Sequence, residues 1–243
     1  MADKPRDVTA RPSGEPAAQS SRGEIEAFLS KVKSLGPAAG TGLRGRLIFA
    51  LDATMSRQPL WDTACKLQAD MFREAAAIGG LDVQLVYYRG LAECRASPWV
   101  SQAERLAELM TRIDCRGGHT QIRRVLEHAR SETERKKVQA LVFVGDAMEE
   151  KIDDLCRMAG ELGLLGVPVF MFQEGYDAIA EQAFREVARL TKGAYCRFDP
   201  GAAHQLAELL RAVAAYAAGG MRALADLSAR QDAGAVKLIA QMR

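Results

Sequence analysis

The stretch LIFALDATMS, residues 47–56, decides how the fold is interpreted. Its five apolar residues end abruptly at Asp52, and Thr54 and Ser56 follow at alternate positions. An apolar run bounded by polar residues is typical of a strand buried on both faces, as in a parallel sheet. Ligands of open α/β sheets bind beside the carboxyl ends of the strands. The pattern therefore brings a carboxylate and two hydroxyls, hard oxygen ligands that suit Mg²⁺, to the place where such folds bind.

Two later segments supply further oxygen ligands. The segment DCRGGHTQI, residues 114–122, contains a glycine pair that is expected to allow a tight turn, and its Thr120 leads into a helical pattern. The segment ALVFVGDAMEE, residues 140–150, repeats the first design, with a buried strand that ends at a glycine and Asp146. Adjacent parallel strands would bring these loops to one edge of the sheet.

These motifs, in this order, resemble von Willebrand factor A domains that carry a metal-ion-dependent adhesion site. That family has D-x-S-x-S after its first strand, a Thr after a glycine turn and an Asp at the end of a later strand. Here the first motif reads D-A-T-M-S, in which Thr54 keeps a hydroxyl, and Thr120 and Asp146 match the other two motifs. The resemblance covers residues 44–218. It implies a bound Mg²⁺ (or Mn²⁺) with the ligands Asp52, Thr54, Ser56, Thr120 and Asp146.

The resemblance also implies a function. In this family one coordination position of the metal remains open, and an acidic residue of a partner protein fills it. The chain is therefore expected to be a non-enzymatic protein-binding module. The residues expected at the rim of its site are Arg57, Gln58, Trp61, Arg116, His119, Met148 and Glu149. Two departures bear on the geometry of the loops: His119 stands directly before Thr120, where the family often has Gly, and Ala147 follows Asp146, where Gly is common.

Other interpretations of the same residues remain open. Asp52 and Asp146 could each cap a following helix, which is a common use of Asp after a strand. Haloacid dehalogenase-like phosphatases also carry an Asp at the end of the first strand, which would make Asp52 a nucleophile, and they bind Mg²⁺ with a later G-D-x-x-x-D. The segment from Gly145 to Glu150 is similar, with Glu in the last place. Thr54 stands where those hydrolases usually have an acidic general acid, which argues against this alternative.

Composition narrows the class of protein. The 243 residues are 48% hydrophobic and 26% charged, which suits one globular domain with extensions. The net charge of +2 gives no electrostatic reason to expect nucleic-acid or membrane binding. The five cysteines are odd in number and scattered, which favours reduced thiols in a cytoplasmic protein. No signal peptide or membrane-spanning stretch is visible in the sequence.

Periodicity predicts a Rossmann-like, doubly wound, mostly parallel sheet with one short antiparallel edge strand, flanked by helices. We expect residues 1–20 to be disordered, 21–43 to form a short helix and a glycine-rich linker, 44–218 to form the A-type domain and 219–243 to form a helical tail. For the tail, packing back on the domain is preferred to docking a partner. The expected strands are 47–51, 81–88, 91–95, 138–144, 167–172 and 194–198. The expected helices of the domain are 59–78, 101–113, 120–135, 149–162, 178–190 and 203–218.

Overall fold

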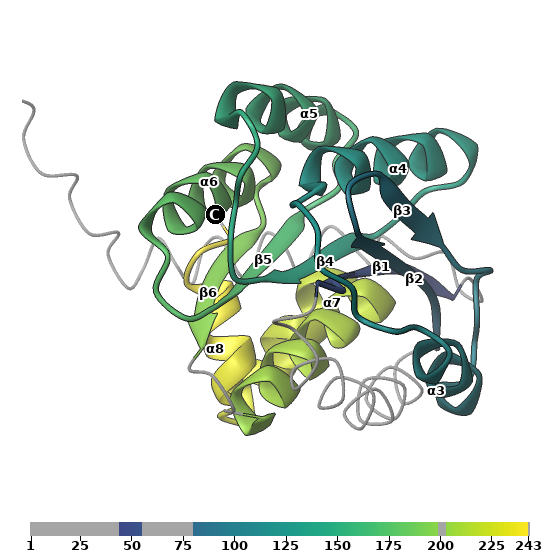
Figure 1. Cartoon of the computed structure of the whole chain (residues 1–243). Helices are drawn as coiled ribbons and strands as arrows, with labels where there is room; N and C mark the ends of the chain where they lie inside the picture. Colours follow the sequence, from purple (N-terminus) through teal and green to yellow (C-terminus); the bar gives the residue numbers. More distant parts are fainter. Residues whose placement is uncertain (1–43, 55–79, 199–202, 243) are drawn as a thin grey trace, which may run out of the picture. The chain divides into compact units, whose positions relative to one another are not determined.

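A single six-stranded sheet organises the chain (Figure 1). The computed structural model describes residues 44–54, 80–198 and 203–242. The strand order is β3-β2-β1-β4-β5-β6, and only the β2–β3 pair is antiparallel. The strands are β1 Gly45–Asp52, β2 Leu81–Arg89, β3 Glu93–Ala96, β4 Ala140–Gly145, β5 Val169–Glu174 and β6 Ala194–Phe198. The doubly wound, mostly parallel sheet with a short antiparallel edge strand is thereby confirmed.

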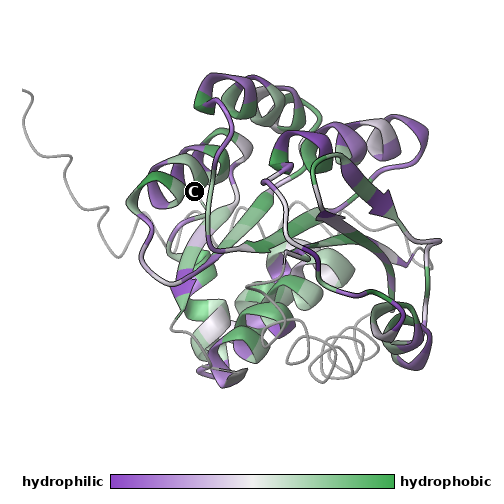
Figure 2. Cartoon of the chain, viewed as in Figure 1, coloured by the Kyte–Doolittle hydropathy of each residue, from purple (hydrophilic) through white to green (hydrophobic). Residues whose placement is uncertain are grey.

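Helices cover both faces of this sheet (Figure 1). They are α3 Ala103–Thr111, α4 Ile122–Arg135, α5 Ile152–Leu164, α6 Ala178–Thr191, α7 Ala203–Ala229 and α8 Ala233–Ile239. The apolar residues of α4, α5 and α6 belong to one buried cluster, and those of α3, α7 and α8 belong to the other. Figure 2 shows that the hydrophobic sides of these helices face the sheet. The expected helix over residues 59–78 and the expected segments before residue 44 lie outside the described residues.

The central strands are apolar on both faces because both faces are covered. All eight residues of β1 are buried. Successive side chains of a strand point to opposite faces, so Leu47 and Phe49 join the α7 cluster, whereas Ile48 and Ala50 join the α4–α6 cluster. Asp52 lies two residues beyond Ala50 and therefore faces the α4–α6 side.

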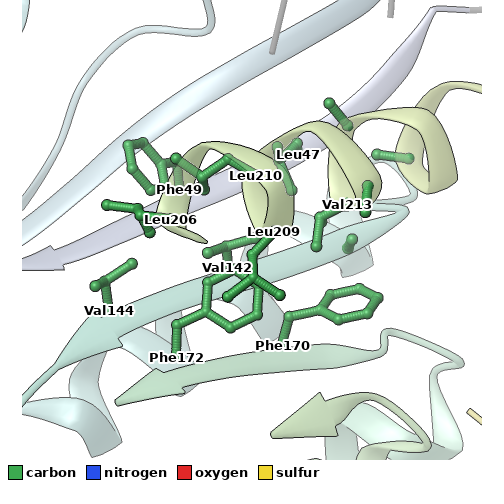
Figure 3. Close-up of a cluster of buried hydrophobic side chains, with 14 of the residues drawn as sticks. Leu47, Phe49, Val142, Val144, Phe170, Phe172, Leu206, Leu209, Leu210 and Val213 are labelled. Carbon is green, nitrogen blue, oxygen red and sulfur yellow. The ribbon is translucent and has the colours of Figure 1, made fainter. Parts of the chain in front are cut away.

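The α7 face of the core is built mainly from three strands and one helix (Figure 3). Aromatic and branched side chains of β1, β4 and β5 pack against leucines and a valine of α7. The labelled members are Leu47, Phe49, Val142, Val144, Phe170, Phe172, Leu206, Leu209, Leu210 and Val213. This packing holds β1 and β4 rigidly side by side, which matters because the candidate ligands stand at the ends of these two strands.

The C-terminal segment packs back on the sheet. Helix α7 continues through the glycine pair at 219–220 with a kink, since Gly220 has a φ of 65°. Asp232 then caps α8 by accepting a hydrogen bond from the Ala235 amide at 2.9 Å. Beyond α8, the side chain of Gln241 accepts a hydrogen bond from the Tyr195 amide of the edge strand β6 at 2.8 Å. The tail thus covers part of this edge.

Two further observations concern the described residues only. None of their helices combines the length and the apolar character needed to cross a membrane. The four cysteines in the described ranges, which are Cys94, Cys115, Cys156 and Cys196, form no disulfide bond.

Candidate metal site at the carboxyl edge of the sheet

Asp52 ends β1 with a buried carboxylate. The residue is 2% exposed, and its Oδ1 accepts a hydrogen bond from the Thr54 amide at 2.8 Å. An ionised carboxylate has about four lone-pair positions, and the side chain of Tyr88 also interacts with this one. The bond to Thr54 is also what the helix-capping interpretation requires, but the helix that Asp52 would cap lies outside the described residues. Asp52 therefore combines a local turn with a position suited to ligand binding.

Asp146 follows β4, the immediate parallel neighbour of β1. The register pairs Leu51 with Val144, so the two aspartates stand just past the ends of adjacent strands. A Cβ atom placed on Gly145 would lie 3.9 Å from the Cβ of Asp52 and only 2.8 Å from the ring of Phe143. The Phe143 ring is therefore what excludes a side chain at this position, and the 3.9 Å distance shows that the end of β4 lies beside Asp52. The two aspartates thus follow the ends of neighbouring parallel strands.

The segment before α4 crosses the same edge of the sheet. The Arg116 amide donates to the Ala53 carbonyl at 2.9 Å, one residue after Asp52. The His119 amide donates to the Gly90 carbonyl at 3.2 Å, in the turn between β2 and β3. These bonds place Thr120 on the edge that carries Asp52, and not on the opposite one.

Thr120 is held by the loop that follows Asp146. Its residue is 7% exposed, its amide donates to Glu149 Oε2 at 3.1 Å, and its Oγ1 accepts a hydrogen bond from the Glu149 amide at 3.0 Å. The hydroxyl also interacts with the carboxylate of Glu150. A hydroxyl oxygen has two lone pairs, so the bond from Glu149 leaves one for another partner. The loop after β4 thus both supplies Asp146 and orients Thr120.

Glu150 serves as the cap of α4 although it belongs to another loop. The residue before this helix, Gln121, makes no capping bond with its side chain. Glu150 instead accepts hydrogen bonds from the Ile122 amide at 2.5 Å and the Arg123 amide at 3.1 Å. Burial raises the pKa of Glu150, and the bonds from these two amides partly oppose that rise. The use of Glu149 and Glu150 at α4 also accounts for the later start of α5, at Ile152 instead of the predicted residue 149.

The role predicted for the glycine pair at 117–118 is wrong in its physical reason. Neither Gly117 nor Gly118 has a positive φ, whereas Gly90 in the β2–β3 turn does, at 60°. A Cβ on Gly118 would lie 2.1 Å from the Gly90 carbonyl oxygen. Glycine is therefore needed at 118 because two backbones touch, and not because of its own turn.

The expected rim residues divide into three groups. Arg116, His119 and Glu149 are exposed, and the ring of His119 lies 3.1 Å from Glu149 Oε2. Met148 is only 8% exposed and packs in the α4–α6 cluster, so its side chain contributes to the core and not to a rim. The remaining rim residues, Arg57, Gln58 and Trp61, lie outside the described residues, as does the predicted metal ligand Ser56.

Tyr88, in β2, is a component of this site that sequence reasoning missed. It is the register partner of Asp52 and is 0% exposed, with its ring stacked on Phe143 at a centroid distance of 6.2 Å. Burial raises the pKa of its hydroxyl well above the ordinary value, and the charge of Asp52, a side-chain interaction with Asp52 and the charges of Glu150 and Asp146 raise it further. In the sequence Tyr88 looks like one more apolar strand residue, and only its alignment with Asp52 gives a signal.

The donor set fits a hard divalent cation. Among the described residues, no group of three or more His, Cys, Asp and Glu side chains is arranged to hold a metal ion. The candidate set does not require one, because it consists of two carboxylates together with hydroxyls, which Mg²⁺ accepts while it keeps several waters. The hydroxyl of Thr120, already oriented from two sides by Glu149 and Glu150, is the kind of ligand whose outer partners fix its geometry.

Comparison of the structure with solved structures places this geometry in a known fold. A von Willebrand factor type A protein from Catenulispora acidiphila superposes with a TM-score of 0.58 at 16% identity, over 72% of this chain and 43% of that one. The fold is that of von Willebrand factor A domains. The SpRpn10 VWA domain gives a TM-score of 0.54 at 13% identity, over 73% of this chain and 98% of its own. An aerotolerance-related membrane protein from Bacteroides fragilis gives a TM-score of 0.53 at 17% identity, and the match covers 68% of this chain and 96% of that one.

Sequence comparison adds no relative to these structural matches. No protein-family model matches the chain, and no curated protein matches it in sequence. At identities of 17% and below, the structural matches establish the A-type fold alone. The present chain also spans less than half of the Catenulispora protein.

Proposed function

We propose that this chain is a protein-binding module that holds Mg²⁺ or Mn²⁺ at the carboxyl edge of its sheet and takes an acidic residue of a partner protein as a further ligand. The observation that supports it is the convergence of Asp52, Asp146 and Thr120 on this edge, with Thr120 fixed by the loop that carries Asp146. Thr54 and Ser56 would complete the set of oxygen ligands. Two carboxylates that bind partly through water leave a divalent ion electrophilic toward another carboxylate.

The position of Glu150 favours binding over phosphatase chemistry. A haloacid dehalogenase-like reaction would need Glu150 as a ligand of the ion, yet its carboxylate accepts hydrogen bonds from two amides at the start of α4. Thr54 also lacks the acidic group of a general acid. Under this proposal the protein does not hydrolyse phosphate esters. Turnover that depends on Mg²⁺ and disappears in Asp52→Asn would contradict it.

Calorimetric titration with Mg²⁺ tests the metal site. Asp146→Ala and Asp52→Asn should each weaken Mg²⁺ binding by more than about tenfold, since even the outer partners of a ligand are worth 10–100-fold. Asp153→Ala is the matched control, because Asp153 is an exposed carboxylate in the first turn of α5. Equal Mg²⁺ affinity in the wild type and all three variants would show that the ion does not bind at this site.

Capture of partners tests the second half of the proposal. Proteins retained by the wild type with Mg²⁺ should be released by chelator and recovered when Mg²⁺ is restored. Asp146→Ala should retain little, whereas Asp153→Ala should behave as the wild type. Retention of the same proteins by Asp52→Ala in excess chelator would show that recognition uses another surface.

A further inference from the structure

A buried hydroxyl at the candidate metal site interacts with the Asp52 carboxylate without completing a hydrogen bond of normal geometry. No group among the described residues forms a hydrogen bond of normal geometry with the hydroxyl of Tyr88, which is shielded completely from solvent. A buried polar group without a partner costs its full desolvation energy, so such groups are rare and call for an explanation. Removing this hydroxyl would relieve the cost, yet the chain has Tyr and not Phe at this position.

The surroundings of this hydroxyl point to the ligands. Tyr88 and Asp52 are aligned partners on neighbouring parallel strands, and both side chains lie on the α4–α6 face of the sheet. The charges of Asp52, Asp146 and Glu150 all act on the hydroxyl. Its ring is fixed by stacking on Phe143, so the hydroxyl cannot turn away from this acidic group without disturbing the core. The side-chain interaction with Asp52 directs the O–H group at that carboxylate, and Glu150, whose charge also acts on the hydroxyl, interacts with Thr120.

We infer that Tyr88 is a positioning residue of the metal site, and this inference rests on the function proposed above. Its hydroxyl donates a hydrogen bond to the Asp52 carboxylate when that carboxylate takes part in holding the divalent ion. Phenol donors of this kind hold a carboxylate ligand in one orientation, and such outer partners contribute to metal affinity. Tyr88 does not touch the ion itself. Without the ion the hydroxyl is poorly partnered and adds little to stability, whereas with the ion it strengthens the bound state.

Tyr88→Phe separates these two effects. Mg²⁺ binding should weaken by about three- to tenfold, which corresponds to the net worth of one hydrogen bond. In chelator, resistance to urea should stay equal or rise, because the variant no longer buries a poorly partnered hydroxyl. A residue that was merely structural would not move these two quantities in opposite directions.

Tyr195→Phe is the matched control. Tyr195 is also buried on this face of the sheet, but its hydroxyl donates to Gln173 Oε1 at 2.7 Å and belongs to β6, two strands away from β4. This variant should lose resistance to urea and keep the Mg²⁺ affinity of the wild type. The two Tyr→Phe changes should therefore have opposite signatures.

The near-ultraviolet difference spectrum upon Mg²⁺ addition gives a second readout, which can first be recorded on the wild type alone. A tyrosine signal is expected there, and it should be absent in Tyr88→Phe and present in Tyr195→Phe. Equal Mg²⁺ affinity in the wild type and Tyr88→Phe, with the same spectral change, would overturn the role of Tyr88 and leave the metal site in place. Failure of the wild type to bind Mg²⁺ would remove both.

Discussion

At the scale of single residues, contacts between backbones restrict the site more than turn conformation does. Gly118 leaves no room for a side chain beside Gly90, whereas a Cβ on Gly117 would meet nothing within 4 Å. Gly118→Ala should therefore lower the free energy of unfolding by about 1–3 kcal/mol through overpacking. Gly117→Ala is the control and should stay within about 0.5 kcal/mol of the wild type. Urea unfolding of both variants checks this, and equal stabilities would contradict it.

A second residue-scale feature is a buried ion pair away from the site. Arg46 lies 3.1 Å from Glu132 Oε2, and the indole nitrogen of Trp99 donates to the same oxygen at 2.8 Å. Burial alone would raise the pKa of Glu132. The hydrogen bond from Trp99 and the neighbouring charges of His128 and Arg46 outweigh it and lower this pKa below its ordinary value of 4.5.

This lowered pKa predicts a pH dependence of stability. A carboxyl group whose pKa is lower in the folded than in the unfolded state stabilises the folded protein. This contribution is complete at pH values above the pKa of the unfolded state, and it is lost as the pH falls through the pKa of the folded state. The free energy of unfolding should therefore decline as pH falls below about 4.5. Glu132→Gln should be less stable at neutral pH, because it leaves Arg46 without its charge partner, and should show a shallower acid decline. Urea unfolding across this range measures both, and an unchanged acid slope in the variant would count against the pair.

At the scale of elements, the N-terminus of α4 depends on a loop that comes later in the chain. Glu150→Ala should lower the free energy of unfolding by about 1–2 kcal/mol, the range for loss of a helix cap. Hydrogen exchange of the Ile122 and Arg123 amides should accelerate, because Glu150 accepts from both. Glu134→Ala, an exposed change near the other end of α4, is the control and should leave these amides protected. Unchanged protection in Glu150→Ala would show that another group caps the helix.

The same elements show which parts of the site can be predicted from the sequence. Asp52 and Asp146 are foreseeable because the apolar pattern marks where a buried strand ends, and parallel pairing brings such ends together. The orientation of Thr120 cannot be predicted in this way, because it depends on interactions with Glu149 and Glu150 in a later loop. Tyr88 cannot be predicted for a different reason. The role of its hydroxyl depends on the register that aligns it with Asp52, whereas the sequence pattern predicts only a buried strand residue at this position.

At the scale of the whole molecule, metal binding and folding are linked. An ion that binds only the folded state adds about 2.7 kcal/mol of stability at a hundred times its dissociation constant. Saturating Mg²⁺ should therefore raise the Tm of the wild type and leave that of Asp146→Ala unchanged. Without metal, Asp146→Ala should keep the fold, because an aspartate just past a strand end contributes little to the core. Thermal unfolding with Mg²⁺ or with chelator measures this, and an equal gain in both proteins would place the stabilising ion elsewhere.

The bond between Gln241 and the Tyr195 amide has a consequence for colloidal behaviour. An edge strand with unsatisfied amides is a template on which another chain can add a strand. Gln241 occupies one such amide of β6. Deleting residues 233–243 should therefore promote concentration-dependent aggregation, visible in light scattering, whereas Val236→Ala, at an exposed position of α8, should not. The segment that carries Gln241 is therefore expected to oppose the addition of a further strand at β6.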